Sequence, residues 1–398
     1  MIKRELYLSK IREFYDKDII KVLIGIRRCG KSVILKQIME EIKENGIDDE
    51  HIIYINFENI KYSFIKDALC LNEYILNNIK DDKKYYLFFD EIQIVKDWER
   101  VINSFKATIN CSIFITGSNS KLLSGELATL LSGRYVSFKI APFSFKEVVE
   151  LKNLNSKNEI EDEFNDYLLW GGMPQRFEFS SIDSIKAYLS DLYSAIILKD
   201  IVKRFNITGV SIFERVMEYL VTNPSQTFST KNMLLEFEKE NIPVSTKTIY
   251  ECLEYAEASL LMSKVSSFDI RGKRILTRRD KYYLTDLGLG QIMNTNKKFQ
   301  YGAYLENIVF NELIIRGYSV SVGNNSNSEI DFIATKHGIK EYYQVTYLLA
   351  DDAVVDREFG AYSKIEDNYP KYVLSMDKLD FSRDGICHKN VIDWLLNK

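Results

Sequence analysis

The sequence predicts a multidomain α/β protein whose first part is a doubly wound parallel sheet. Short apolar segments rich in Ile, Tyr and Phe recur in residues 1–150, and stretches with helical periodicity separate them. Continuous apolar segments of this length are typical of strands that are covered on both faces. The length of 398 residues exceeds what one hydrophobic core usually holds, so we expect about two or three domains.

The composition excludes several classes of protein. Hydrophobic residues make up 46% of the chain and charged residues 28%, which is typical of a folded globular protein and not of a disordered one. The five cysteines and three histidines are scattered, which argues against a disulfide framework or a structural zinc site. No apolar segment approaches membrane-spanning length, and the opening MIKRELYLSKIREFYDKD lacks a signal-peptide core. We therefore expect a cytoplasmic protein that does not associate with membranes. The net charge of -4 excludes neither nucleic acid nor protein partners.

Four apolar segments are expected to form strands of the first sheet. They are IIKVLIG (19–25), HIIYINF (51–57), YYLFFD (85–90) and CSIFITG (111–117). Amphipathic stretches at 31–45 and 96–109 are expected to form helices between them. Strands that alternate with helices in this way favour parallel pairing.

The first strand leads into a segment that fits the pattern G-x-x-x-x-G-K-[ST]. This segment predicts a binding site for ATP with Mg²⁺, because its backbone N–H groups can surround phosphates while the next helix points its amino end at them. Lys31 is expected to reach the β- and γ-phosphates, and the Ser32 hydroxyl to bind Mg²⁺. A chance strand-to-helix turn is the alternative. The predicted binding residues are Gly25, Ile26, Arg27, Arg28, Cys29, Gly30, Lys31, Ser32 and Val33.

Polar residues follow two later strands of the predicted sheet. Asp90 and Glu91 end an apolar strand, and we expect Asp90 to hold Mg²⁺ through water and Glu91 to polarise the attacking water. Thr116, Ser118 or Asn119, at the end of the next strand, is expected to contact the γ-phosphate or that water. A polar loop without such a role is the alternative for each of these three residues.

Cys29 lies directly before Gly30 and allows two interpretations. Its basic neighbours and the helix amino end could favour a reactive thiolate. The alternative is a small, shielded thiol of ordinary reactivity.

The region after the first domain, which we place at about 1–155, turns helical. Residues 156–207 predict a helical connector, and residues 208–290 predict three helices and a hairpin, which is the composition of a winged helix. Ser245 is expected to cap the second helix of the helix-turn-helix. The 264–281 wing is rich in basic residues that suit a duplex DNA backbone: Lys264, Arg271, Lys273, Arg274, Arg278, Arg279 and Lys281. Three glutamates on the candidate recognition helix would repel DNA, so docking of a protein is the alternative: Glu251, Glu254 and Glu257.

These motifs together resemble the AAA-type ATPases, with Walker A at 25–32, Walker B at 85–91 and a sensor-1-like segment at 116–120. The segments at 130–148, 170–174 (WGGMP) and 198–205 (LKDIVKRF) are similar to those of a widespread prokaryotic family. In that family an AAA-like core is joined to a winged helix and a restriction-endonuclease-like domain. The resemblance implies that Arg134 contacts the γ-phosphate, within the chain or across an interface of a homo-oligomer. A surface arginine at a turn is the alternative.

The carboxyl-terminal residues 300–398 resemble the PD-(D/E)XK nuclease core. The resemblance implies that Glu306 and Asp331 are vestigial metal ligands. The expected Glu-x-Lys is replaced by Gln344-Val-Thr346, which removes a strong ligand and the cationic group, so we expect a degenerate domain. Lys336 or Lys340 could supply the missing cation.

The sequence therefore predicts an ATPase that couples its nucleotide state to a partner, either duplex DNA or an unknown protein. One alternative is a DNA-binding regulator that uses ATP as a switch and turns over slowly. The other is an ATP-gated nuclease.

Overall fold

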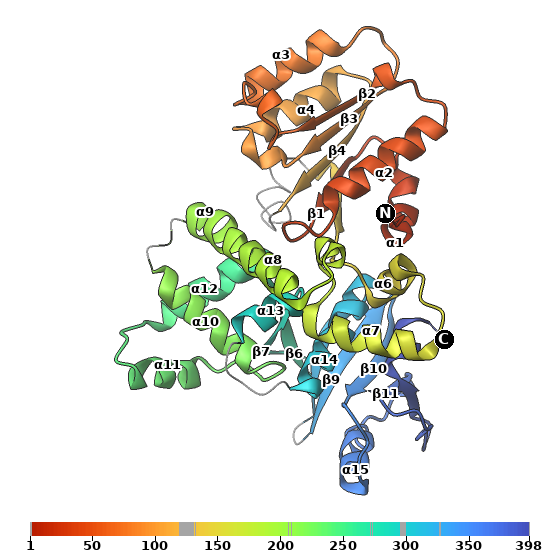
Figure 1. The fold of residues 1–398 in the computed structure, drawn as a ribbon, viewed down its shortest axis with the longest axis vertical. Coiled ribbons are helices and arrows are strands. Elements are labelled where there is room, and N and C mark those ends of the chain that lie inside the picture. The colour runs from red at the N-terminus through yellow and green to blue at the C-terminus, as the bar shows by residue number, and fades with distance from the viewer. Residues whose placement is uncertain are drawn as a thin grey trace. The chain divides into compact units, whose positions relative to one another are not determined.

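The computed structural model divides the chain into two compact units (Figure 1). It describes residues 2–118, 131, 133–205, 207, 209–270, 272, 274–294, 300–325 and 328–397. The first unit comprises Met1–Pro142 with Ala258–Leu260, and the second comprises Phe143–Glu257 with Leu261–Lys398. Within the described ranges, no helix is both long enough and apolar enough to cross a lipid bilayer.

A parallel five-stranded sheet forms the centre of the first unit, as the sequence predicts. The order of its strands is β2-β3-β4-β1-β5. Their bounds are β1 Ile20–Ile24, β2 Ile52–Asn56, β3 Tyr85–Asp90, β4 Cys111–Gly117 and β5 Tyr135–Lys139. Four of them match the apolar segments, and every residue of β1 and β3 is buried. The fifth strand, β5, was not predicted, because its residues are only partly buried and its sequence has no continuous apolar segment.

Helices connect these strands in the alternating pattern of a doubly wound fold. They are α1 Glu5–Ile11, α2 Lys31–Glu44, α3 Ala68–Asn78 and α4 Trp98–Thr108, with short 3₁₀ turns at Arg12–Phe14, Asp49–His51, Ile60–Tyr62 and Ile92–Ile94. The helix α4 buries Trp98, Val101, Ile102 and Phe105, whose spacing places them on one face. These side chains join residues of β1 to β4 in one core, which holds the strand ends in place.

The second unit begins earlier than the sequence suggested. The predicted first domain ended at about 155, whereas the compact unit ends at Pro142. The helix α6, Phe145–Lys152, belongs to the second unit, and Ser144 and Glu147 form a capping box at its start. The helices that follow are α7 Lys157–Trp170, α8 Ile182–Ala195, α9 Lys203–Phe205, α10 Val210–Thr222, α11 Thr230–Lys239, α12 Thr246–Ala258, α13 Leu287–Met293, α14 Tyr301–Ile315, α15 Asp352–Gly360 and α16 Val391–Leu395. A 3₁₀ turn at Pro174–Glu178 and a π-helix at Ile196–Val202 interrupt them.

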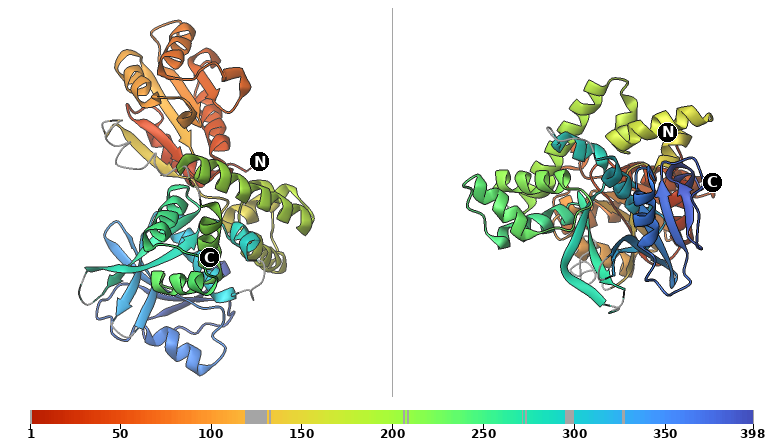
Figure 2. Two further views of the ribbon diagram at one scale, coloured as in Figure 1. Left: turned by 90° about the vertical axis from the view of Figure 1, so that its left-hand side faces the viewer. Right: turned by 90° about the horizontal axis from the view of Figure 1, so that it is seen from below.

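A seven-stranded mixed sheet unites two parts of the chain that the sequence analysis separated. Its order is β12-β11-β10-β9-β8-β6-β7 (Figures 1 and 2). The bounds are β6 Met262–Asp269, β7 Arg274–Leu284, β8 Ser319–Asn325, β9 Ser328–Lys336, β10 Ile339–Val345, β11 Lys371–Ser375 and β12 Cys387–Asn390.

The hairpin β6–β7 falls in the predicted winged helix, yet β6 pairs in parallel with β8 of the predicted nuclease-like domain. Strands from the predicted domains at 208–290 and 300–398 thus share one sheet and lie in one compact unit. The helix-turn-helix order of α11 and α12 is present, and the Ser245 hydroxyl accepts a hydrogen bond from Thr248 N at 3.1 Å, as a cap. The assignment of a winged helix and of a nuclease-like fold to this unit remains a prediction.

Candidate nucleotide-binding site

The loop from Gly25 to Gly30 joins the buried strand β1 to the helix α2. Gly30 has φ of +104°, a left-handed conformation that favours glycine. A Cβ atom on Gly25 would lie 2.3 Å from the carbonyl oxygen of Ile140, so only glycine fits there. No described side chain caps the amino end of α2. The first N–H groups of this helix, on Lys31, Ser32 and Val33, are therefore suited to an anion.

The ammonium group of Lys31 lies between the phosphate loop and the end of β3. It donates hydrogen bonds to the carbonyl oxygens of Gly25 at 3.0 Å and Ile26 at 3.3 Å. The same nitrogen lies 3.7 Å from the carboxylate oxygen Oε1 of Glu91. The side chain is 4% exposed, so the charge is held in a largely dehydrated position. The structure thus brings together two predicted site residues that are far apart in the sequence.

Asp90 is fully buried at the end of β3, and both of its carboxylate oxygens accept hydrogen bonds. Thr116 Oγ1 donates to Oδ1 at 2.5 Å, and the Tyr54 hydroxyl donates to Oδ2 at 3.0 Å. Burial and the nearby Asp90 carboxylate raise the pKa of Tyr54 above its ordinary value, so Tyr54 stays a donor. The orientation of Asp90 is therefore fixed by neighbours on β2 and β4.

Glu91 lies at the strand end in a left-handed conformation, with φ of 57°. Its backbone N–H donates to Thr116 Oγ1 at 2.9 Å, and Gln93 Nε2 donates to its carboxylate oxygen Oε2. Among the described residues, Ser118 Oγ and Gln93 Oε1 are buried polar atoms without a hydrogen-bond partner. Such orphaned atoms next to a strand end fit a site that takes a polar ligand.

Three residues of this site make contacts that were not predicted from the sequence. Thr116 was considered for a role at the γ-phosphate, but its hydroxyl binds Asp90 and Glu91. Tyr54 and Gln93 were not considered at all. Tyr54 carries no motif, although its strand pairs with β3 and places Asn56 opposite Asp90. Asn119 lies outside the described residues.

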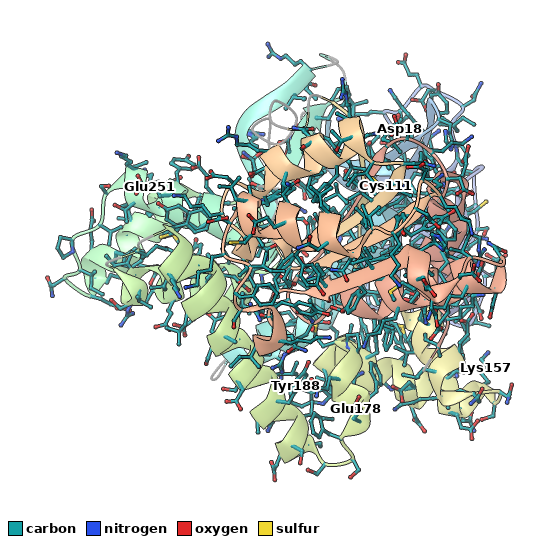
Figure 3. The ribbon with its side chains drawn as sticks, turned by 90° about the horizontal axis from the view of Figure 1, so that it is seen from above. Asp18, Cys111, Lys157, Glu178, Tyr188 and Glu251 are labelled. Atoms are coloured by element: carbon teal, nitrogen blue, oxygen red, sulfur yellow. The ribbon has the colours of Figure 1, made fainter. Side chains whose placement is uncertain are left out.

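Arg134 lies away from the phosphate loop of its own chain. It precedes β5, and its carbonyl oxygen accepts a hydrogen bond from the N–H of Ile20, the first residue of β1. The strand β1 rises about 3.3 Å per residue, so Gly25 is roughly 16 Å further along the sheet. The charge of Arg134 is also close enough to Asp18 to help lower the pKa of Asp18. Figure 3 labels Asp18 and Cys111, and Cys111 is the first residue of β4. A role within one chain therefore does not fit this position, and a role across a subunit interface remains a prediction.

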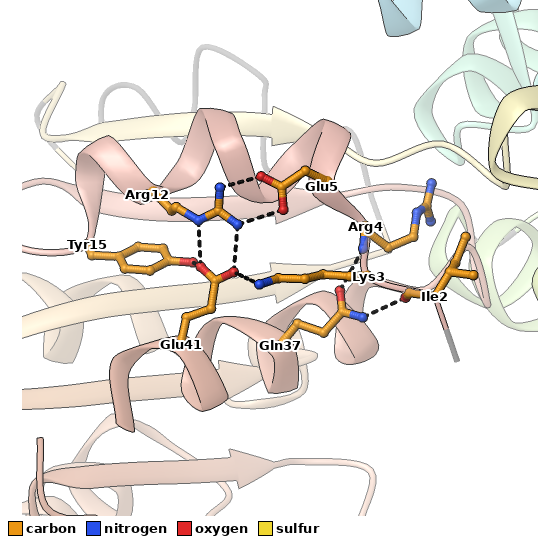
Figure 4. Close-up of polar contacts among 8 residues, drawn as sticks. All are labelled: Ile2, Lys3, Arg4, Glu5, Arg12, Tyr15, Gln37 and Glu41. Atoms are coloured by element: carbon orange, nitrogen blue, oxygen red, sulfur yellow. Dashed lines mark hydrogen bonds and ion pairs between the residues drawn. The ribbon is translucent and has the colours of Figure 1, made fainter. Parts of the chain in front are cut away.

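The amino-terminal segment contacts the phosphate loop through Arg4, which the sequence analysis missed. Figure 4 shows Arg4 beside Gln37 of α2. Its guanidinium group is 2% exposed and donates from Nη1 to the carbonyl oxygen of Cys29 at 3.2 Å. Its backbone N–H donates to Gln37 Oε1 on α2 at 3.1 Å. No motif marks Arg4, because its partners lie far along the chain.

Cys29 itself is fully buried, and burial raises the pKa of its thiol. Removal from water outweighs the pull of Lys31 and Arg4, which favours the second interpretation, a thiol of ordinary reactivity. A shielded thiol is what the structure describes.

Comparison with known proteins agrees with this geometry. Residues 17–149 match the family model of an AAA domain, and residues 161–300 match a domain of unknown function (DUF8612). An uncharacterized protein of Haemophilus influenzae is 38% identical over 399 aligned residues, which cover 100% of this chain and 99% of that one. The chain belongs to the family of this protein.

Other relatives extend the comparison. The uncharacterized protein MJ1544 of Methanocaldococcus jannaschii is 34% identical, over 92% of this chain and 84% of that one. Among solved structures, the Aeropyrum pernix ORC2 protein in ADPNP and ADP complexes is 11% identical, with a TM-score of 0.38 over 78% of this chain and 91% of that chain. The AAA domain model spans most of the first unit, including its parallel sheet and the loop from Gly25 to Gly30.

The two residues that the sequence analysis predicted as vestigial metal ligands lie in the second unit. Glu306 on α14 and Asp331 on β9 are both buried. Neither lysine suggested as a replacement cation lies with them: Lys336 Nζ donates to the Arg316 carbonyl oxygen, and Lys340 lies over the Phe268 ring. The cation that does lie there is Lys281, from β7.

The wing is consequently less basic than its sequence suggested. Lys281 is 2% exposed and cannot reach a DNA phosphate. Lys264 pairs with Asp280 at 3.1 Å, which neutralises part of the remaining charge. Arg274 and Arg279 are exposed on β7, the edge strand of the sheet. Arg271 and Lys273 lie outside the described residues, and the side chain of Arg278 is likewise not described.

Proposed function

We propose that the AAA domain binds ATP with Mg²⁺ and hydrolyses it. The observation that carries this proposal is the position of the Lys31 ammonium, 3.7 Å from the Glu91 carboxylate and hydrogen-bonded to the phosphate loop. A cation on the loop that faces a carboxylate at a strand end is the arrangement that phosphoryl transfer to water requires.

The residues present fit a magnesium nucleotide. The uncapped amino end of α2 offers N–H groups, and Lys31 adds a full positive charge beside them. Ser32, the second residue of α2, and Asp90 provide the oxygen ligands that Mg²⁺ prefers. Bound Mg²⁺ would supply charge neutralisation at the β- and γ-phosphates.

Different side chains of the AAA domain have different roles in ATP hydrolysis. Glu91 accepts the proton of the attacking water. Hydrogen bonds to Gln93 and to the Thr116 hydroxyl hold Glu91 in position. Tyr54 and Thr116 fix the Asp90 carboxylate so that it does not have to reorganise when the nucleotide binds. Ser118, whose buried hydroxyl has no partner in the described part of the chain, is the sensor of the γ-phosphate, together with Asn119.

We also infer that nucleotide state is passed to a partner through the residues where the AAA domain ends. Ile140 N donates to the carbonyl oxygen of Ile24 at 2.6 Å, directly before the phosphate loop. A change in that loop therefore acts on the segment 140–142, from which the chain continues into the second unit. Arg134 would complete the site of a neighbouring subunit in a homo-oligomer.

The decisive experiment measures ATP binding and phosphate release in Lys31→Ala and Glu91→Gln. Loss of a positioned general base should slow turnover in Glu91→Gln at least about a hundredfold while ATP binding is kept. Lys31→Ala should lose ATP binding itself. Glu99→Gln, the same chemical change on α4, is the matched control. Turnover at the wild-type rate in Glu91→Gln would remove Glu91 from the mechanism.

The second candidate function is a DNA-binding regulator that uses ATP as a switch. The exposed Arg274 and Arg279 on the edge strand β7 favour it, since an edge of this charge can follow a phosphate backbone. Stimulation of the ATPase by duplex DNA would support the first candidate. DNA affinity that depends on ATP binding, with little turnover, would support the second.

A further inference from the structure

A buried cluster of charges lies in the second unit, between the helix α14 and the seven-stranded sheet. The Lys281 ammonium lies 3.3 Å from Glu306 Oε1 and 2.6 Å from Glu329 Oε1. The side chains of Lys281 and Glu306 are only 3% and 10% exposed. Asp331 lies two residues from Glu329 on β9, and burial together with the nearby Glu306 carboxylate raises the pKa of Asp331. One ammonium group thus serves several carboxylates that come from α14 and β9.

One carboxylate oxygen of Glu306 and one of Asp331 accept hydrogen bonds from protein donors. Glu306 Oε1 accepts from the Tyr283 hydroxyl at 2.6 Å as well as from Lys281. Asp331 Oδ2 accepts from the N–H of Val345 at 2.8 Å, and Gln344 Oε1 accepts from the N–H of Asp331 at 3.3 Å. Lys281 is the cation at Glu306 Oε1, so a metal ion at this carboxylate would have to replace the ammonium group.

The residues therefore do not fit a divalent cation. Across the described part of the chain, no group of three or more His, Cys, Asp or Glu side chains could hold a metal ion. A divalent ion next to the Lys281 ammonium would also meet a like charge in a place that water barely reaches.

We propose that the ammonium group of Lys281 takes the position of a divalent cation between Glu306 and Asp331, and that the second unit keeps these carboxylates without metal. Burial of uncompensated carboxylates is costly, and a buried cation within ion-pair distance offsets that cost. This inference is independent of the proposed ATPase function, since it involves only the second unit.

The position of Lys281 in the chain gives the cluster a second effect. Lys281 belongs to β7, whereas its partners Glu306 and Glu329 belong to α14 and β9. The neighbouring Leu284 and Asn307 add two hydrogen bonds between β7 and α14, at 2.9 and 2.8 Å. The ion pairs thus connect the hairpin β6–β7 to the carboxyl-terminal part of the sheet.

The test uses the full chain, without nucleotide, as wild type and as Lys281→Met, which keeps the length of the side chain and removes its charge. Lys264→Met, on β6 of the same hairpin, is the matched control. Breaking a buried ion pair should shift the folding equilibrium of Lys281→Met by on the order of a hundredfold, measured by urea unfolding, whereas Lys264→Met should stay close to wild type.

Mn²⁺ then tests whether the Lys281 ammonium occupies a position that a metal ion could take, or whether the Lys281 side chain only fills space. Mn²⁺ should raise the unfolding midpoint of Lys281→Met but not that of the wild type, and Asp331→Asn added to Lys281→Met should abolish this rise. Lys281→Met combined with Glu306→Gln, which removes both charges, should recover part of the lost stability.

Three outcomes would overturn the proposal. The first is Mn²⁺ bound by the wild type, detected by electron paramagnetic resonance and lost in Asp331→Asn. The second is Lys281→Met that is as stable as Lys264→Met. The third is a Lys281→Met variant that is destabilised but whose unfolding midpoint does not change with Mn²⁺. This result would show that the ammonium group does not occupy a position that a metal ion can take. If Lys281→Met does not fold, the wild-type Mn²⁺ measurement alone decides between the alternatives.

Discussion

The guanidinium group of Arg4 donates a hydrogen bond to the carbonyl oxygen of Cys29, across 3.2 Å. Its second amino group, Nη2, donates to the carbonyl oxygens of Ala141 at 3.1 Å and Pro142 at 3.4 Å. One buried side chain therefore joins the phosphate loop to the last residues of the AAA domain. A buried guanidinium that is satisfied by carbonyl groups holds those groups in a fixed geometry.

Arg4→Met should weaken ATP binding about tenfold or more. The substitution leaves carbonyl oxygens at the phosphate loop without their charged donor, which costs roughly 1–3 kcal/mol. Arg4→Lys, which keeps one donor and the charge, should recover part of the affinity. The dissociation constant of a fluorescent ATP analogue provides the measurement. The matched control is Lys3→Met at the exposed neighbouring position. Equal affinity in all four proteins would contradict a role of Arg4 in positioning the loop.

The carboxylate of Glu41 on α2 should make the free energy of unfolding of the AAA domain depend on pH in the acidic range. Hydrogen bonds from Arg12, with further ones from Lys3 and Tyr15, lower the pKa of Glu41 to about 2, from an ordinary value of 4.5 (Figure 4). A lowered pKa means that this stabilisation is complete above pH 4.5 and disappears as the pH falls towards 2.

Glu41→Gln should therefore be less stable than the wild type at neutral pH, and the difference should shrink between pH 4.5 and 2. We expect the free energy of unfolding to fall by about 1–2 kcal/mol at pH 7. This value is smaller than the pKa shift alone would give, because solvent screens the partly exposed Arg12 and Lys3. Urea unfolding at several pH values measures the difference, and Glu40→Gln on the exposed side of α2 is the control. A difference that does not change with pH would show that Glu41 acts through packing alone.

Gly172 should tolerate no side chain. A Cβ atom there would lie 2.1 Å from the carbonyl oxygen of Phe143, and the Gly172 N–H donates to Asp286 Oδ2 at 2.7 Å. Gly172→Ala must therefore displace backbone, and we expect a loss of about 2 kcal/mol or more in the free energy of unfolding. Gly360→Ala is the control, because a Cβ atom at Gly360 meets nothing within 4 Å. Equal unfolding midpoints for the two variants would contradict this account of the WGGMP segment.

The exposed arginines of β7 should carry any binding of duplex DNA by the wing. Reversing Arg274 and Arg279 to glutamate should weaken binding and lower the slope of log affinity against log salt by about 0.9 for each DNA phosphate that is no longer neutralised. Lys389→Glu, on the exposed side of β12, reverses one charge at another strand, as each arginine substitution does, and should leave the slope unchanged. An unchanged slope in the arginine variant would favour docking of a protein on this edge.

The sequence alone determined the parallel sheet and the phosphate loop of the AAA domain, because both depend on local patterns. Apolar segments long enough for buried strands, followed by Gly25 to Ser32 and by Asp90 and Glu91, leave few other arrangements. The Ser245 cap is equally local, since donor and acceptor are three residues apart. The strand β5 escaped prediction because a half-buried edge strand has no such pattern.

Only the tertiary structure decided which distant groups meet. Arg4 reaches Cys29, Tyr54 reaches Asp90, and Lys281 reaches Glu306, and in each case the partners are more than twenty residues apart in the sequence. Periodicity specifies which face of an element is buried, but it does not specify the neighbour on which that face packs. The same reason explains the hairpin β6–β7, whose strands the sequence predicted and whose pairing with β8 it did not. The charge of Lys281 was visible in the sequence, whereas its burial among carboxylates follows from the pairing of the sheet.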